Sequence, residues 1–238
     1  MNIRLPIALI CLIAATACGV PPVHSPVVRP DNILDFDYLY ARNCGGCHGS
    51  NGRGGPAIGL GDPVYLAIAD DATIRRVTED GVPGIAMPAF AKHSGGMLTD
   101  DQISVIVSGI RSRWSKPNIL RNASAPPYAA VSPGDSTRGA AVYVTYCSSC
   151  HGTDGRGAKR ASSIVDGSFL GLVSDQYLRT VVIVGRPELG APDWRNDLPG
   201  RPMSDQDVSD VVAWLAAQRP RFPGQPYSTE AQLEGRFR

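Results

Sequence analysis

The sequence predicts an all-α protein made of two tandem helical domains joined by a proline-rich linker. The first observation behind this prediction is an internal repeat, in which the second half of the chain resembles the first at an offset of roughly 100 residues. The second is the order of expected elements in each copy, helix, glycine-rich loop, helix, loop and helix, which requires no β-sheet. The third is the length of 238 residues with 43% hydrophobic side chains, which suits two small globular domains.

The charge balance restricts the partners of the chain. Lys and Arg number 23 and Asp and Glu number 22, for a formal net charge of +1. A nearly neutral chain offers no broad positive field for nucleic acid or an anionic membrane surface. With 7% aromatic residues and 20 prolines, the chain has few large side chains to fill two conventional hydrophobic cores. We therefore expect a non-protein group to fill them.

The first seventeen residues, 1–17, predict a secretory signal peptide. Arg4 provides the positive start, an apolar run follows, and small residues stand at the expected cleavage positions. The run is too short to span a bilayer. The chain is therefore predicted to be exported to the periplasm or cell envelope.

The cysteine at the end of this leader suggests a lipid anchor. The segment Ala15-Thr16-Ala17-Cys18 resembles the lipobox of bacterial lipoproteins, although cleavage at an Ala-x-Ala site would instead leave Cys18 as a free thiol. We favour acylation, because an exposed unpaired thiol is a liability in an oxidising compartment. Residues 18–30, which are rich in proline, are then predicted to form a tether, and the anchor at Cys18 is the membrane contact we expect.

Four further cysteines form two identical motifs, C-x-x-C-H at 44–48 and at 147–151. This is the attachment pattern of haem c, and a chain of this composition yields on the order of 0.0025 chance matches. Two thiols on one helical turn can reach both vinyl groups of one porphyrin, and the adjacent histidine can reach the iron. Two covalently bound haem c groups are therefore predicted. The attachment residues are Cys44, Cys47, Cys147 and Cys150, and the proximal iron ligands are His48 and His151.

Three other interpretations of the cysteines remain as alternatives. They are a disulfide scaffold, a thioredoxin-like redox motif and a zinc site with four cysteine ligands. None of them requires a histidine directly after each cysteine pair, so all three leave part of the pattern unexplained.

The repeat defines the domain plan. We predict a first domain over residues 31–118, a linker over 119–133, a second domain over 134–220 and a C-terminal tail over 221–238.

Three helices are expected in each domain. The first pair spans 35–43 and 137–146, the second 71–78 and 175–184, and the third 103–110 and 208–217. Thr99 and Ser204 carry N-cap chemistry for the third pair, since each is followed three residues later by Gln or Asp.

The motifs and their order resemble the class I c-type cytochromes, twice over. The resemblance covers most of residues 31–118 and 134–220 and rests in the first copy on the haem motif, Gly52-Arg53-Gly54, Gly55-Pro56 and Met87-Pro88-Ala89-Phe90. It implies that Met87 is the distal ligand of the first iron. It also implies that Pro56 supports the proximal histidine, its carbonyl accepting the imidazole N–H.

The second copy departs from this family at two places. Ala191 stands where the first copy has Met87, and no proline matches Pro56. Met203 is the methionine left in this copy and is a candidate ligand, although an apolar residue at its position usually packs in a core. An open iron or an unforeseen ligand is the alternative, so the two irons are predicted to differ in coordination.

The remaining histidines, methionines and tryptophans are weaker candidates for a role at iron. We expect His93 to be solvated, Met97 to compete poorly with Met87, and His24 to lie in the tether. The tryptophans, Trp114, Trp194 and Trp214, are expected to pack in the cores and against the haems.

The predicted function is electron transfer. A dihaem cytochrome would relay single electrons between donor and acceptor redox proteins or a membrane respiratory or photosynthetic complex, and would not be an enzyme. The alternative is a second haem that is open or weakly ligated and acts as a peroxidase or binds gas, with Asp193 and Arg195 as the nearest polar groups. A redox or gas sensor is the third hypothesis, and no output module in the sequence supports it.

Overall fold

The computed structural model describes residues 28–196 and 198–220. The predicted signal peptide, Cys18 and the C-terminal tail fall outside these residues. The described residues from Leu34 onward form one compact unit, and those before it contain a 3-10 turn, η2 (Pro30–Asn32). The regular elements of the described residues are all helices, accompanied by isolated β-bridges. The predicted all-α class is confirmed.

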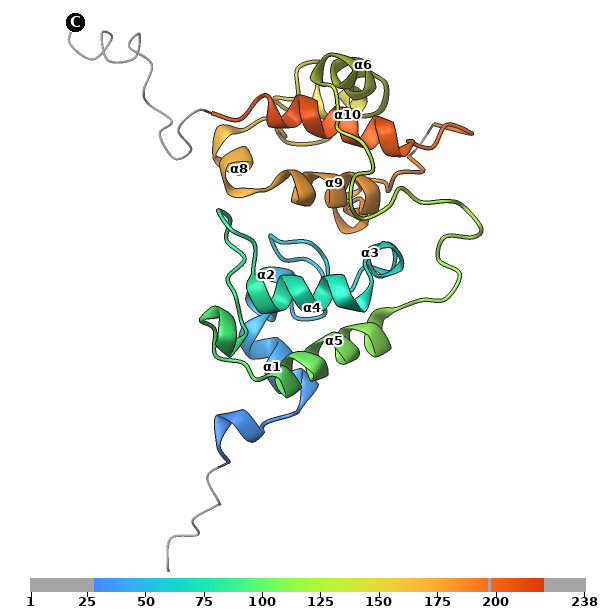
Figure 1. The fold of residues 1–238 in the computed structure, drawn as a ribbon. Helices are drawn as coiled ribbons and strands as arrows, with labels where there is room; N and C mark the ends of the chain where they lie inside the picture. Colours follow the sequence, from blue (N-terminus) through green and yellow to red (C-terminus); the bar gives the residue numbers. More distant parts are fainter. Residues whose placement is uncertain (1–27, 197, 221–238) are drawn as a thin grey trace, which may run out of the picture. The chain divides into compact units, whose positions relative to one another are not determined.

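Each half of the compact unit has the same order of helices (Figure 1). The first half contains α1 (Phe36–Asn43), α2 (Gly45–His48), α3 (Pro63–Ile68), α4 (Asp71–Asp80), η3 (Lys92–Ser94) and α5 (Asp100–Trp114). The second half contains α6 (Ser136–Tyr146), α7 (Ser148–His151), α8 (Gly167–Leu172), α9 (Asp175–Val184), η4 (Pro187–Leu189) and α10 (Asp205–Ala216).

The helix starts follow local capping chemistry. The predicted caps of the last helices are confirmed as full capping boxes, Thr99 with Gln102 and Ser204 with Asp207. The short helices α3 and α8 were not expected from the sequence, because a helix of six residues is too short to show an apolar period. Asp62 and Asp166 cap them through their side chains.

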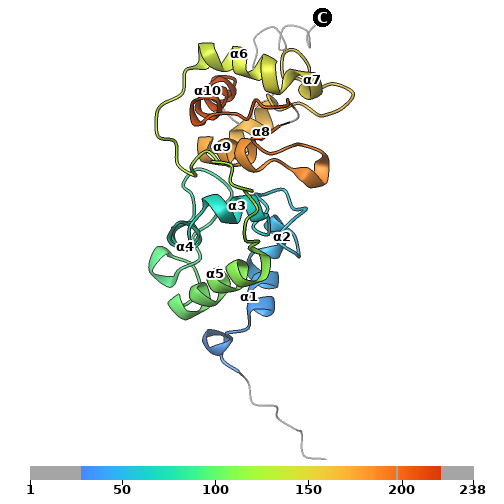
Figure 2. The same cartoon turned by 90° about the vertical axis from the view of Figure 1, so that its right-hand side faces the viewer.

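The first and last helices of each half pack against one another, α1 on α5 and α6 on α10 (Figure 2). In each half a glycine permits the close approach of these two helices. The glycine lies on the last helix in the first half and on the first helix in the second half. An added Cβ at Gly109 of α5 would lie 2.0 Å from the ring of Phe36. An added Cβ at Gly139 of α6 would lie 2.0 Å from the carbonyl oxygen of Asp210 in α10.

We expect Gly139→Ala to destabilise the second half by about 1 to 3 kcal/mol, the usual cost of overpacking. The obstacle is a backbone carbonyl, which cannot rotate away as a flexible side chain can. Thermal unfolding followed by circular dichroism measures the effect. Gly46→Ala is the matched control, since an added Cβ there meets nothing within 4 Å. Equal melting temperatures for the two variants would contradict the prediction.

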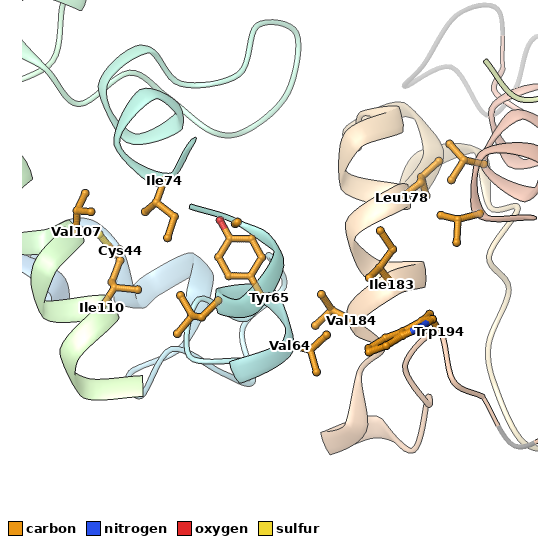
Figure 3. Close-up of a cluster of buried hydrophobic side chains, with 14 of the residues drawn as sticks. Cys44, Val64, Tyr65, Ile74, Val107, Ile110, Leu178, Ile183, Val184 and Trp194 are labelled. Carbon is orange, nitrogen blue, oxygen red and sulfur yellow. The ribbon is translucent and has the colours of Figure 1, made fainter. Parts of the chain in front are cut away.

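The buried side chains form one cluster that includes residues of both halves. Figure 3 shows part of it, with Val64 of α3 beside Val184 of α9, and both side chains are buried. Trp194 is 1% exposed, and Trp114 packs edge-on against Tyr40 with ring centroids 5.0 Å apart. Trp214 stacks on Tyr143 with ring centroids 4.2 Å apart, so the predicted packing of the three tryptophans in the cores is confirmed.

The linker is tied to the second half by a buried arginine. Arg179 of α9 donates to the carbonyl of Pro127 at 2.8 Å and to that of Tyr128 at 3.1 Å. Its guanidinium also pairs with Asp205 at the start of α10. The proline-rich segment therefore has a defined path here, because two of its consecutive carbonyls accept from a charged donor.

Candidate haem sites

The end of α1 and the short helix α2 place the first haem motif on one helical turn. The N–H of Cys44 closes α1 on the carbonyl of Tyr40 at 2.8 Å, and the N–H of His48 donates to the carbonyl of Cys44 at 3.0 Å. Cys44, Cys47 and His48 are thus held within a single turn, as their spacing predicts. None of the four motif cysteines forms a disulfide.

The second motif has the same construction. The N–H of Cys147 donates to Tyr143 at 2.8 Å, and that of His151 donates to Cys147 at 3.0 Å. A tyrosine ties each motif to its first helix: the hydroxyl of Tyr40 donates to the carbonyl of Gly49 at 2.9 Å, and that of Tyr143 donates to Gly152. The glycine after each histidine is therefore anchored from the preceding helix.

Before haem attachment, the first cysteine of each motif favours the neutral thiol. Burial raises the pKa of Cys44 to about 12 and that of Cys147 to about 11, and the neighbouring cysteine of each pair adds to the rise. Zinc binds thiolates. Among the described residues no three His, Cys, Asp or Glu side chains gather as a metal cluster, so the zinc alternative has no support.

A backbone carbonyl holds each proximal imidazole. Nδ1 of His48 lies 2.7 Å from the carbonyl oxygen of Ile58, and Nδ1 of His151 lies 2.8 Å from that of Ser162. A carbonyl only accepts, so Nδ1 carries the proton and Nε2 keeps its lone pair. Burial lowers the pKa of His48, partly opposed by the bond to Ile58, and favours the neutral imidazole that binds iron.

These donors fit haem c in both halves. Each half offers two thiols on one turn and a histidine whose Nε2 is available to iron. The sequence model of the family described as cytochrome c oxidase, cbb3-type, subunit III matches residues 31–108 and 134–215, one segment in each half. The chain belongs to this family of c-type cytochromes. The cytochrome therefore carries two covalently bound haem c groups, as predicted.

Curated relatives of the cytochrome are subunits of respiratory complexes. It is 24% identical over 188 residues to the cytochrome bc1 complex cytochrome c subunit of Mycobacterium bovis, covering 78% of this chain and 64% of the relative. It is 28% identical over 145 residues to the cbb3-type cytochrome c oxidase subunit FixP of Sinorhizobium medicae, covering 56% of this chain and 44% of the relative. The chain thus spans less than two thirds of the length of these relatives.

Two solved structures are similar to the cytochrome. One is the reducing HAO-like protein complex of Kuenenia stuttgartiensis, with a TM-score of 0.40 and 18% identity over 77% of this chain and 95% of that one. The other is thiosulfate dehydrogenase of Marichromatium purpuratum, with a TM-score of 0.31 and 20% identity over 98% of this chain and 55% of that one. Neither similarity is close.

Across residues 28–196 and 198–220, the cytochrome has no helix with the length and apolar character needed to cross a membrane. Cytochrome c homologues are exported to the periplasm or cell envelope, in keeping with the export predicted here.

The expected role of Pro56 is wrong in one respect. The carbonyl that accepts from the His48 imidazole belongs to Ile58. The N–H of Ala57 donates to the carbonyl of Cys47 at 3.0 Å, and this turn brings the following residue, Ile58, to the imidazole.

The second half makes the equivalent bond without a proline. Ser162 accepts from His151 there, in a loop that the N–H of Gly157 closes on the carbonyl of His151 at 2.9 Å. The missing proline therefore does not distinguish the two proximal sites. The two halves still differ on the distal side.

The distal candidates occupy different environments. Met87 lies in the loop after α4, where its side chain is half-buried and its carbonyl accepts from Val82 at 2.9 Å. Met203 is 6% exposed and belongs to the buried cluster.

The two weaker candidates for the distal ligand of the first iron, Met97 and His93, are exposed. Met97 is 80% exposed, and the His93 side chain lies 4.0 Å from Asp100 and faces solvent. Neither environment suits a ligand of a buried iron.

Two residues of the second half contact the glycine-rich loop of the first, and no pattern in the sequence indicated them. The hydroxyl of Tyr177 donates to the carbonyl of Pro56 at 3.2 Å. Arg186 donates from Nη2 to the carbonyl of Gly55 at 3.0 Å. These partners are far apart in the chain, so only the folded structure brings them together.

Proposed function

We propose that the cytochrome relays single electrons between partner redox proteins of the bacterial cell envelope and is not an enzyme. The observation that carries this proposal is the pair of similar haem sites within one compact unit. Haem supplies the one-electron chemistry, and the protein sets its potential through the axial ligands and their hydrogen bonds. The relatives in bc1 and cbb3 complexes support a membrane respiratory complex as partner.

The contact between the halves supports electron exchange within the chain. Tyr177 and Arg186 hold the glycine-rich loop that also carries Ile58, whose carbonyl orients the His48 imidazole. Burial raises the pKa of Tyr177, so its hydroxyl keeps the proton that it donates to Pro56. A continuous path of covalent and hydrogen bonds therefore joins α9 to the proximal side of the first haem.

A peroxidase reaction has less support from the geometry. It requires a group near the distal face that can move a proton. Asp193 and Arg195 are engaged with one another, with Nε of Arg195 3.0 Å from both carboxylate oxygens, and the guanidinium lies 4.6 Å from the centroid of the Trp194 ring. Neither group is free for proton transfer in this arrangement.

The relay is tested by following electron exchange between the haems after rapid reduction of one of them. We expect the oxidised cytochrome to take up two electrons per chain and to consume no peroxide. Tyr177→Phe combined with Arg186→Gln removes the two hydrogen bonds to the carbonyls of Pro56 and Gly55, so equilibration between the haems should slow.

Arg156→Gln is the matched control for this experiment, since Arg156 is exposed on the corresponding loop of the second half and pairs with Asp154. The control should exchange electrons as the wild type does. Catalytic peroxide consumption by the wild type would contradict the relay proposal and support the peroxidase alternative.

We propose in addition that acylated Cys18 anchors the cytochrome to the membrane, with residues 18–30 as a tether. One acyl chain binds a membrane only marginally, so stable anchoring requires the several chains of a processed lipoprotein. Cys18→Ser should release the cytochrome from washed membranes, while Cys11→Ser, within the predicted leader, should not. If both variants stayed on the membrane equally, the lipid anchor would be refuted, and a partner complex would have to hold the cytochrome there.

A further inference from the structure

The distal loops of the two halves correspond residue for residue at their ends. In the first half the N–H of Val82 donates to the carbonyl of Met87 at 2.9 Å, and in the second the N–H of Arg186 donates to that of Ala191 at 3.0 Å. The glycine before each loop has a positive φ, 66° at Gly81 and 73° at Gly185. An added Cβ at Gly81 would lie 2.7 Å from the carbonyl oxygen of Met87, and one at Gly185 would lie 2.7 Å from that of Ala191. Ala191 therefore occupies the backbone position of Met87.

The remaining methionine of the second half occupies a core position. The N–H of Met203 donates to the carbonyl of Trp194 at 2.8 Å, and in the first half the N–H of Leu98 donates to that of Phe90 at 2.8 Å. Both Met203 and Leu98 are 6% exposed, and each directly precedes the N-cap of the last helix of its half. Met203 thus corresponds to a leucine, which has no atom that ligates iron.

The second distal loop is held by bonds of its own. Arg186 and Ala191 exchange both backbone hydrogen bonds, at 3.0 and 3.1 Å, and the Arg186 side chain pairs with Glu188 at 2.6 Å and with the carbonyl of Gly55 at 3.0 Å. In the first half, the loop between Val82 and Met87 has the equivalent of only the first of these backbone bonds, from the N–H of Val82 to the carbonyl of Met87. The second loop therefore keeps its shape without a bond from a side chain to iron.

We propose that the second haem has an open distal face that binds a small neutral diatomic ligand, carbon monoxide or nitric oxide, in the ferrous state. Ala191 has no ligating atom at the backbone position where Met87 offers a thioether, while the proximal side, with the His151 imidazole held by Ser162, is complete. This inference depends on the two haem sites and goes beyond electron relay, since gas binding requires no redox partner.

Carbon monoxide titration of the reduced, haem-loaded cytochrome tests the proposal. We expect the wild type to bind one carbon monoxide per chain. Ala191→Met should supply the missing thioether, abolish this uptake and add a second methionine-to-iron charge-transfer band in the ferric spectrum. Uptake that persists unchanged in Ala191→Met would overturn the proposal that the alanine at this position opens the distal face.

Met203→Leu is the second variant and reproduces the residue of the first half, so it keeps the core filled. We expect one carbon monoxide per chain and an unaltered spectrum of the second haem, as in the wild type. A wild type that binds none, together with a Met203→Leu variant that binds one, would make Met203 the ligand and overturn the proposal. Both results are independent of electron exchange with a partner and so separate this inference from the relay.

Discussion

Replacing Met87 with alanine is expected to open the first haem to carbon monoxide and to lower its reduction potential. A thioether ligand stabilises the ferrous state, so its loss favours the ferric state and leaves a coordination position free. The loop should keep its path, because its bond to Val82 uses the carbonyl of residue 87 and not the side chain. Carbon monoxide uptake should rise by one per chain relative to the wild type, and a spectroelectrochemical titration should show one haem shifted.

Met97→Ala is the matched control for this experiment. Met97 lies in the same half and is 80% exposed, so its removal should change neither carbon monoxide uptake nor either potential. If Met97→Ala opened the first haem and Met87→Ala did not, the distal position would have to be reassigned.

Intact-mass measurement after denaturation is expected to show the processed chain with two haems attached. Thioether bonds survive unfolding, whereas axial bonds to iron do not, so the mass reports covalent attachment alone. A variant with Cys147→Ala and Cys150→Ala should retain one haem, and its second half should melt at a lower temperature, because a tightly bound group stabilises the folded state.

The reciprocal variant, Cys44→Ala with Cys47→Ala, is the control for this result. It should lose the first haem and keep the second, since each motif is built on its own helical turn. A wild-type mass that lacks either haem would refute the assignment of the corresponding motif.

Local spacing was sufficient to predict the single-turn geometry of the haem motifs and the N-caps of the last helices. Cys44, Cys47 and His48 lie within one helical turn, so the sequence interval alone places them close together. The capping box of Thr99 with Gln102 is equally local, since both partners lie in the same first turn. For such features the sequence by itself determined the outcome.

The carbonyl that holds each imidazole was decided by the tertiary structure. The bond from His48 goes to Ile58 and not to Pro56, because the closure of Ala57 on Cys47 sets which residue of the loop reaches the ring. The same geometry in the second half arises around Ser162 without a proline. A loop of glycines has many paths of similar local energy, and packing selects among them.

The contacts between the halves and the environment of Met203 also required the folded chain. Tyr177 meets Pro56 across more than half the length of the chain, and Arg186 meets Gly55 in the same way. Sequence alone established that the second half lacks the Met87 equivalent. The repeat also aligned Met203 with Leu98. That both residues are buried and make the same backbone bond was decided by long-range packing, which residue spacing does not encode.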